Sequence, residues 1–173
     1  MSSTPISLAA LNAASMSEFM RVLGDVVEHS PWVAERAFAK RPYRSIDDLN
    51  AKLMTCIRET SRAEQIELFN QHPELAGREA MAGEMTESST GEQGRLGLTR
   101  LPSEQFQRLA HVSRTHREKF GFPFIVALRL HDALDEVMRE GEVSLSNGLE
   151  AEIERTLQQI SAIVYGRLGR IVC

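Results

Sequence analysis

The sequence is short of cysteine and of aromatic residues. Its 173 residues include 2 cysteines and 1 tryptophan, and aromatic residues make up 6% of the chain. Cys56 lies in a stretch with helically spaced apolar residues, and Cys173 is the last residue. Two cysteines so placed exclude a disulfide framework, and we expect both to be reduced thiols, as is usual in a cytosolic protein.

Membrane and targeting signals are missing as well. No apolar run approaches the ~20 residues that a membrane-spanning helix needs. The first residues, MSSTPISLAALNAASM, lack the charged start and the continuous apolar core of a secretory signal. The final residues, RIVC, do not form a peroxisomal address. We therefore expect a cytoplasmic protein that does not engage a membrane.

Charge and motif content exclude further classes. Lys and Arg number 20 against 24 Asp and Glu, a net charge of −4, and no basic cluster is present, so nucleic acid is not an expected partner. The catalytic patterns GxSxG, GxGxxG, GxxxxGK[ST] and HExxH are all absent. His111 and His116 are placed on different faces of a helix by their spacing, and neither belongs to a metal-ligand pattern. We expect no metal site.

What the sequence does contain is a series of helix signals. Hydrophobic residues make up 42% and charged residues 25%, which is ordinary globular usage, and the length suits one domain over residues 1–173. The spacing of Phe19, Val22, Leu23 and Val26 predicts a helix with one apolar face. We predict an all-α, single-domain protein.

Serines mark the starts of the helices that follow. Ser30 is a candidate N-cap, with Pro31 at the first helical position. Ser45 precedes an acidic first turn and a helically spaced apolar series. Ser61 and Glu64 form a capping-box pattern that predicts the start of a fourth helix.

The second half of the sequence is less uniform. Residues 77–100 are rich in Gly, Ser and Thr, and we expect an irregular loop that carries function. Ser103 is a candidate N-cap of a helix that ends at Gly121. The run 122–130, FPFIVALRL, fits either a buried strand or a short buried helix. A last helix is predicted over 149–172 by apolar residues at helical spacing, namely Ile153, Leu157, Ile160, Val164 and Leu168.

His72, in NQHPELAG, is the first candidate for chemistry. The fourth helix must end near it, because Pro73 disfavours the helical conformation in the residue before it. A histidine at a helix C-terminus lies beside the last carbonyls, where the negative end of the helix dipole favours the imidazolium. His72 could therefore act as a general acid or base near neutral pH. The alternative is a surface histidine that only caps the helix.

Two further candidate sites are equally open. Ser89 and Glu92 match another capping box, which would be a purely structural feature. The alternative is a binding site, because the amide of Gln93 suits a urea or lactam edge and a helix N-terminus attracts anions. Arg167 is either a solvated surface arginine or, turned inward, a partner for a carboxylate or enolate oxygen. Phe124 is expected in the core rather than at a ligand.

Taken together, these segments resemble the 2-oxo-4-hydroxy-4-carboxy-5-ureidoimidazoline (OHCU) decarboxylase family. The similarity covers most of the chain with the motifs in the family's order, and HPELAG together with FGFPF is its most specific part. The segments are residues 19–49, FNQHPELAG, TESSTGEQGRLGL, REKFGFPFIVALR and the last helix with Tyr165-Gly166-Arg167-Leu168.

The resemblance implies a fold and a reaction. It implies an all-α, single-domain multi-helix bundle that forms a homodimer and needs no metal or organic cofactor. The implied reaction converts a small molecule, OHCU, to (S)-allantoin in urate breakdown. For residues 122–130 the resemblance favours the helix over the strand.

The resemblance also assigns site residues. His72, Glu92 and Arg167 are implied as catalytic. Substrate contacts are implied for Pro73, Ser89, Thr90, Gly91, Gln93, Phe124, Ile125, Val126, Ala127 and Leu128. We hypothesise that Arg167 and backbone N–H groups of the 124–128 segment hold ring oxygens where charge grows, while His72 transfers a proton. Glu92 would orient His72 or bind ureido N–H groups.

The chain departs from the family pattern in one region. Gly91 stands where a longer side chain is common, and Gly94-Arg95-Leu96 replaces smaller residues, so the local helix could be looser. Two other functions stay open. One is a non-catalytic helical dimerisation or adaptor module, in which His72, Glu92 and Arg167 do not converge. The other is a decarboxylase or tautomerase of a related ureido compound.

Overall fold

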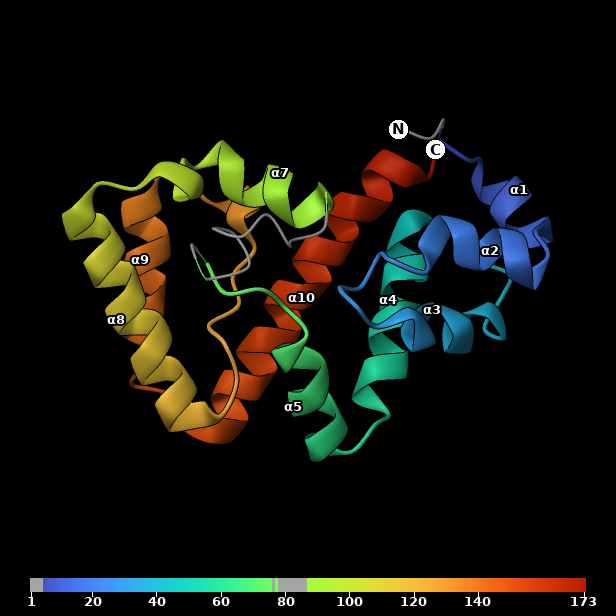
Figure 1. Cartoon of the computed structure of the whole chain (residues 1–173). Coiled ribbons are helices and arrows are strands. Elements are labelled where there is room, and N and C mark those ends of the chain that lie inside the picture. The colour runs from blue at the N-terminus through green and yellow to red at the C-terminus, as the bar shows by residue number, and fades with distance from the viewer. Residues whose placement is uncertain (1–4, 76, 78–86) are drawn as a thin grey trace. The chain divides into compact units, whose positions relative to one another are not determined.

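The computed structural model describes residues 5–75, 77 and 87–173, and there its regular elements are helices (Figure 1). An isolated parallel bridge joins Ile6 to Val172. The all-α prediction is confirmed. In chain order the elements are α1 (Leu8–Ala13), α2 (Met16–Leu23), α3 (Pro31–Phe38), α4 (Ile46–Arg58), α5 (Arg62–Asn70), α7 (Glu87–Arg95), the 3-10 helix η1 (Leu98–Arg100), α8 (Ser103–Phe120), the 3-10 helix η2 (Leu128–Leu130), α9 (Leu134–Ser144) and α10 (Leu149–Ile171).

Contacts within the chain divide it into two compact units. The first unit is Met1–Gln65 with Ser161–Cys173, and the second is Ile66–Ile160. Helices α5 and α10 therefore contribute residues to both units. A single domain over residues 1–173 stays a prediction.

The first unit is built on successive helices, with α3 packed against both α2 and α4. Phe19 of α2 is fully buried, and its ring centroid lies 5.3 Å from Phe38 in an edge contact and 6.2 Å from Tyr43 in a stack. From the C-terminal part of α10, Val164 and Leu168 are buried as their helical spacing predicted.

In the second unit α8 and α9 pack against each other (Figure 1). The approach is close at Gly141, where an added Cβ would lie 2.7 Å from Cγ1 of Val112. Helix α8 ends at Gly121 as predicted, with a φ of 81° and an N–H that donates to the carbonyl of Arg117. A left-handed residue at this position is a common helix stop, and glycine adopts it without strain.

The predicted helix starts are confirmed in part. The Ser45 hydroxyl accepts a hydrogen bond in the first turn of α4. Ser61 and Glu64 form the full capping box, with donor–acceptor distances of 2.8 and 3.3 Å. Ser30 does precede α3, but its side chain makes no capping hydrogen bond. The assignment of Ser103 as N-cap is wrong by one residue, since it is the first helical residue of α8.

Two segments differ from their sequence predictions. Residues 87–95 form helix α7, although their polar composition indicated an irregular loop. Residues 122–127 form neither a helix nor a strand, and only the 3-10 turn η2 follows them. Pro123 disfavours a helix because it lacks an N–H and restricts the residue before it. Helices α1 and α9 had no counterpart among the predicted elements.

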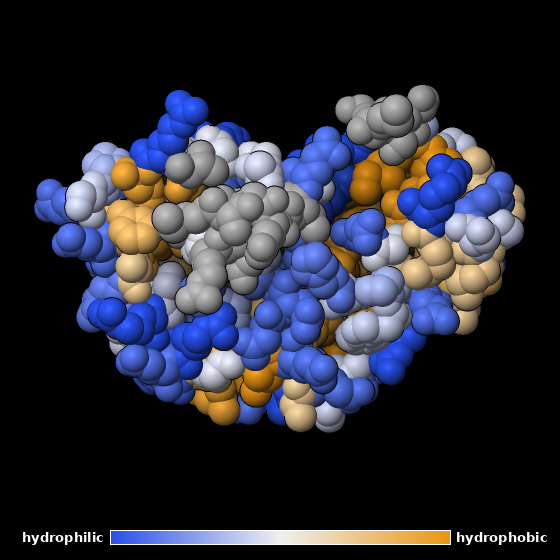
Figure 2. All heavy atoms as spheres, viewed as in Figure 1, coloured by the Kyte–Doolittle hydropathy of each residue, from blue (hydrophilic) through white to orange (hydrophobic). Residues whose placement is uncertain are grey.

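In the described part of the chain, every helix is too short or too polar to cross a bilayer. Figure 2 shows hydrophilic residues over much of the visible face, with hydrophobic residues in separate areas. Among the larger apolar side chains, Phe106 of α8 is 40% exposed and Val143 of α9 is 62% exposed.

Candidate active site

His72 lies directly after the end of α5. Its backbone N–H donates to the carbonyl of Phe69 over 3.1 Å, and its ring Nδ1 lies 3.3 Å from the carbonyl oxygen of Leu68. That oxygen only accepts, so a hydrogen bond there puts a proton on Nδ1 and leaves proton exchange to Nε2. The side chain caps the last turn as predicted. With 8% of its surface exposed, however, His72 is not a surface residue.

The residues after His72 hold its loop in place. Pro73 is half-buried and Leu75 is buried. Between them, Glu74 forms an ion pair with Arg117 of α8 at 2.7 Å. Arg117 also donates to the side-chain oxygen of Asn70, the last residue of α5, over 3.0 Å. The end of α5 and the motif that follows it are thus tied to α8.

Helix α7 presents two predicted substrate residues on its buried face. Ser89 and Gln93, one turn apart, are 5% and 3% exposed. Glu92 is half-buried, whereas Thr90 and Gly91 lie on the exposed face. The capping-box interpretation of Ser89 and Glu92 is wrong, because both lie inside a helix that starts at Glu87.

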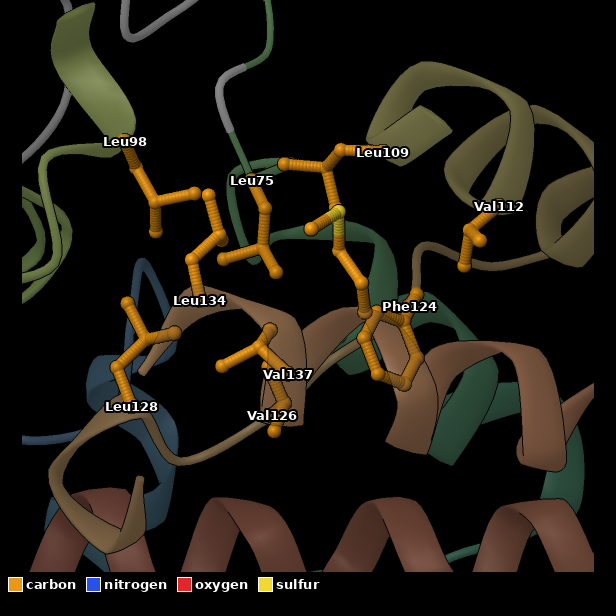
Figure 3. Packing of buried hydrophobic residues seen from close by; sticks show 10 residues of the cluster. Leu75, Leu98, Leu109, Val112, Phe124, Val126, Leu128, Leu134 and Val137 are labelled. Atoms are coloured by element: carbon orange, nitrogen blue, oxygen red, sulfur yellow. The ribbon is translucent and has the colours of Figure 1, made fainter. Parts of the chain in front are cut away.

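Three motif segments of the second unit meet in one place. The Gln93 amide donates to the carbonyl of Glu74 over 3.2 Å, which joins α7 to the segment after His72. In Figure 3 the side chains of Leu75, Leu98 and Leu134 point toward one another. The cluster draws from the His72 motif, η1, the 122–130 run, α8 and α9, and comprises Leu75, Leu98, Leu109, Val112, Phe124, Val126, Leu128, Leu134, Val137 and Met138.

The side chains of residues 124–128 belong to the core. All five are buried, and the Phe124 ring lies against His116 and Arg155 (ring centroid 5.7 Å from that of His116, and 5.0 Å from the guanidinium carbon). The core assignment of Phe124 is confirmed. If this segment contacts a ligand, the contact is therefore made by its backbone groups. The Ala127 N–H already donates to Oε1 of Gln159 over 2.8 Å, which removes it from the backbone donors hypothesised for substrate.

Arg167 is buried in the first unit, so its interpretation as a solvated surface arginine is wrong. It is 3% exposed, and its Nη1 lies 2.9 Å from Oε2 of Glu28 and 3.4 Å from the carbonyl of Val26. Glu28 is itself 1% exposed. The next residue, His29, has a φ of 46°, the left-handed region that non-glycine residues adopt rarely. Sequence reasoning missed Glu28, and its only signal was a charged residue inside the segment 19–49.

Sequence reasoning also missed a chain of linked ionisable side chains in the second unit. His116 Nε2 lies 2.8 Å from Oε1 of Glu152, which also accepts from Arg155 over 2.8 Å. Arg155 pairs with Glu140 at 3.0 Å, and Glu140 with His131 at 3.0 Å. Spacing alone does not reveal this chain, because its members come from three separate segments.

The buried carboxylate in this chain is held ionised. Burial alone would raise the pKa of Glu152, but hydrogen bonds from His116 and Arg155, the charge of Arg155 and a hydrogen bond from Asn147 outweigh it and lower the pKa to about 2. A fully buried negative charge is tolerable only with such partners.

The described residues offer no ready-made metal centre and no paired thiols. In that part of the chain no group of three or more His, Cys, Asp or Glu side chains is placed to hold a metal ion. Cys56 and Cys173 are both free cysteines, one buried and one exposed. Burial raises the pKa of the Cys56 thiol, which makes it a poor nucleophile at neutral pH.

The fold and site define an all-α protein in which a buried histidine follows α5 and the polar helix α7 is bonded to the segment after that histidine. Comparison with known proteins makes this description specific. The model of the OHCU decarboxylase family matches residues 12–169. The chain belongs to this family, as the sequence motifs indicated, and is a decarboxylase.

Individual relatives agree with this assignment. A 2-oxo-4-hydroxy-4-carboxy-5-ureidoimidazoline decarboxylase from Halalkalicoccus jeotgali is 34% identical, over 97% of this chain and 93% of that protein. One from Mus musculus is 33% identical, over 94% and 91%. The crystal structure of an (S)-allantoin synthase superposes with a TM-score of 0.73 at 24% identity, over 96% of this chain and 54% of that one, which supports the fold.

Proposed function

We propose that this protein decarboxylates OHCU to (S)-allantoin in urate degradation. Family membership supports this reaction, since curated relatives along nearly the whole chain are decarboxylases of that compound. The observation that carries the proposal is the convergence of the His72 motif, the Gln93 helix and the 124–128 run within the second unit.

The chemistry requires an acid/base and a place for charge. Loss of carbon dioxide breaks a carbon–carbon bond and leaves an electron pair, which spreads onto the neighbouring imine or carbonyl before a proton reaches the carbon on one face. His72, with Nδ1 bonded to the Leu68 carbonyl, is suited to take the hydroxyl proton or to deliver the final proton through Nε2. Burial of His72 supports this role, because proton transfer in a water-poor site is not diverted to solvent.

Polar groups of α7 would bind the ring and its ureido arm. Ser89 and Gln93, on the buried face, are suited to fix the ring's register through hydrogen bonds, and Glu92 to orient His72 or accept from ureido N–H groups. Thr90 and Gly91 are exposed, so a contact from them would use the backbone. Pro73 and the backbone of the 124–128 segment would border the substrate.

Arg167 would stabilise oxygen atoms on which negative charge develops. A guanidinium placed only on the substrate carboxylate would stabilise the ground state, which aids binding more than rate. Glu28 accepts from Arg167 and so fixes where its charge lies. We therefore assign Arg167 to the ring oxygens, where charge grows after decarboxylation.

The wider setting belongs to the same proposal. We expect the chain to work as a homodimer and as one domain in the cytoplasm. Size-exclusion chromatography with light scattering measures the mass directly, and a mass near twice that of the chain is the expected result.

The test of the proposed function is the His72→Asn variant. We expect at least a 100-fold loss of turnover with a near-native circular dichroism spectrum, because asparagine keeps a polar side chain but cannot exchange a proton. Since the spontaneous reaction gives racemic product, the assay follows the optical activity of the allantoin formed from OHCU. His111→Asn, an exposed histidine on α8, is the matched control and should keep wild-type activity.

Two outcomes would redirect the assignment. A His72→Asn variant with most of its activity removes His72 from the mechanism. If the wild-type protein forms no optically active allantoin, two alternative functions remain: a non-catalytic adaptor module, or a decarboxylase of another ureido compound. Crystals soaked with allantoin distinguish these two, because the adaptor predicts no density beside His72.

A further inference from the structure

The run from Phe122 to Ala127 is buried but has no regular secondary structure. Its backbone N–H and C=O groups therefore lack the regular partners that a helix or a strand supplies. A buried backbone group without a partner is costly, so such a run needs bonds from elsewhere. Side chains from two helices, α8 and α10, provide such bonds, and a third helix, α7, binds the turn that follows.

Helix α10 supplies two of these bonds. Nη2 of Arg155 donates to the carbonyl of Ile125 over 3.0 Å. One helical turn later, Oε1 of Gln159 accepts from the N–H of Ala127 over 2.8 Å. Both bonds lie within the 124–128 segment, and the two side chains leave α10 from neighbouring positions on its surface. Arg155 is itself fixed by Glu152 and Glu140, so its guanidinium has little freedom to move.

Helix α8 binds the start of the run through His116. Nδ1 of this fully buried ring lies 3.0 Å from the carbonyl of Phe122, and Nε2 lies 2.8 Å from Glu152. Both partners are acceptors, so both contacts are hydrogen bonds when each ring nitrogen carries a proton.

Through Arg95, helix α7 binds the turn that follows the run. Nη2 of Arg95 donates to the carbonyl of Leu128 and, over 2.7 Å, to that of His131. Arg95 occupies the position where the sequence departs from the smaller residues of its family. Ser89, Glu92 and Gln93, which are proposed to bind the substrate, also lie on α7. Arg95 therefore links this helix to the 124–128 segment, whose backbone is proposed to border the substrate.

We propose that Gln159, Arg155 and Arg95 are positioning residues that fix the backbone of the 124–128 segment for substrate. This inference rests on the proposed function, in which that segment borders the ring. Backbone groups assist a reaction most when they are already aimed at the developing charge, and a shift of about 1 Å can cost about 100-fold in rate. Gln159, Arg155 and Arg95 fix the position of these backbone groups in a segment that has little regular secondary structure of its own.

Gln159 offers the sharpest test, since only its oxygen is used. Gln159→Leu removes the acceptor of the Ala127 N–H, whereas Gln159→Glu keeps an oxygen at the same place. Gln158→Leu, on the exposed side of the same helix, is the matched control. We expect Gln159→Leu to lower kcat/KM at least 10-fold with a raised KM, Gln159→Glu to stay within about 3-fold of wild type, and Gln158→Leu to be unchanged.

Two further readouts separate positioning from folding. A merely structural loss would reduce the amount of active enzyme but leave KM and the optical purity of the enzymatic product unchanged. Hydrogen exchange of the Ala127 amide should accelerate at least 10-fold in Gln159→Leu alone. Arg95→Ala should raise KM in the same way, against Arg100→Ala, another exposed arginine, as its control.

The result that overturns the inference differs from failure of the proposed function. Wild-type KM and optical purity in Gln159→Leu, or an equal defect in Gln159→Glu, would refute positioning while His72→Asn still tests the reaction. Wild-type protein without activity on OHCU would instead remove the function on which the inference rests, whatever the exchange of Ala127 shows.

Discussion

The buried ion pair of Glu28 and Arg167 is a residue-scale feature with a measurable cost. Each side chain is almost inaccessible, and removal of one partner takes a charge-assisted hydrogen bond from a charge that is buried in a poor solvent for ions. We expect Glu28→Gln to lower the free energy of unfolding by about 3–5 kcal/mol, measured by urea denaturation followed by circular dichroism.

The control for this prediction is Glu35→Gln, an exposed residue of α3, which should change stability by less than about 0.5 kcal/mol. Adding Arg167→Met to Glu28→Gln should cost less than the sum of the two single changes, since the pair is lost only once. Equal effects of Glu28→Gln and Glu35→Gln would contradict the buried pair.

At the scale of elements, two glycines on different helices should respond to alanine in opposite ways. Gly94 lies on the exposed face of α7, and an added Cβ would meet no atom within 4 Å, so Gly94→Ala should stabilise the protein by up to about 1 kcal/mol through helix propensity. Gly141 faces α8, where an added Cβ would lie 2.7 Å from Val112, so Gly141→Ala should destabilise it by about 1–3 kcal/mol.

Thermal unfolding of the two variants beside wild type measures this contrast, with a higher Tm for Gly94→Ala and a lower one for Gly141→Ala. A stabilised Gly141→Ala would mean that α8 and α9 do not approach as closely as their contacts indicate. The same comparison tests whether Gly94 loosens α7.

For the molecule as a whole, Glu152 predicts how stability depends on pH. Its pKa falls from 4.5 to about 2 on folding, so the folded state favours the ionised form. The stabilisation, about 3 kcal/mol, is fully present above about pH 4.5 and is lost as the pH falls through about 2, with about half gone by pH 3. Urea unfolding between pH 7 and pH 3 measures this loss.

A Glu152→Gln variant should be less stable at pH 7 and should lack this part of the acid dependence. The exposed neighbour Glu150→Gln serves as the control and should follow the wild-type curve. Parallel curves for Glu152→Gln and wild type would show that the Glu152 carboxylate is not held ionised by His116 and Arg155.

Local sequence determined much of the fold and the nature of its chemistry. Apolar spacing and capping serines predicted α4, α5 and the last helix, because hydrogen bonds within a few residues decide where a helix starts and ends. Pro73 likewise predicted the end of α5 beside His72. The motifs around His72 were also sufficient to indicate the family.

Tertiary structure alone decided the remainder, because the stabilising partners are distant in sequence. Helix α7 is too polar to be predicted from periodicity, and its buried Gln93 bonds to the segment after His72. The run 122–127 forms no regular element since side chains of α8 and α10 satisfy its backbone. From the sequence alone, Arg167 could be a surface residue. In the structure it pairs with Glu28, which lies 139 positions earlier, and only folding brings these two charges together.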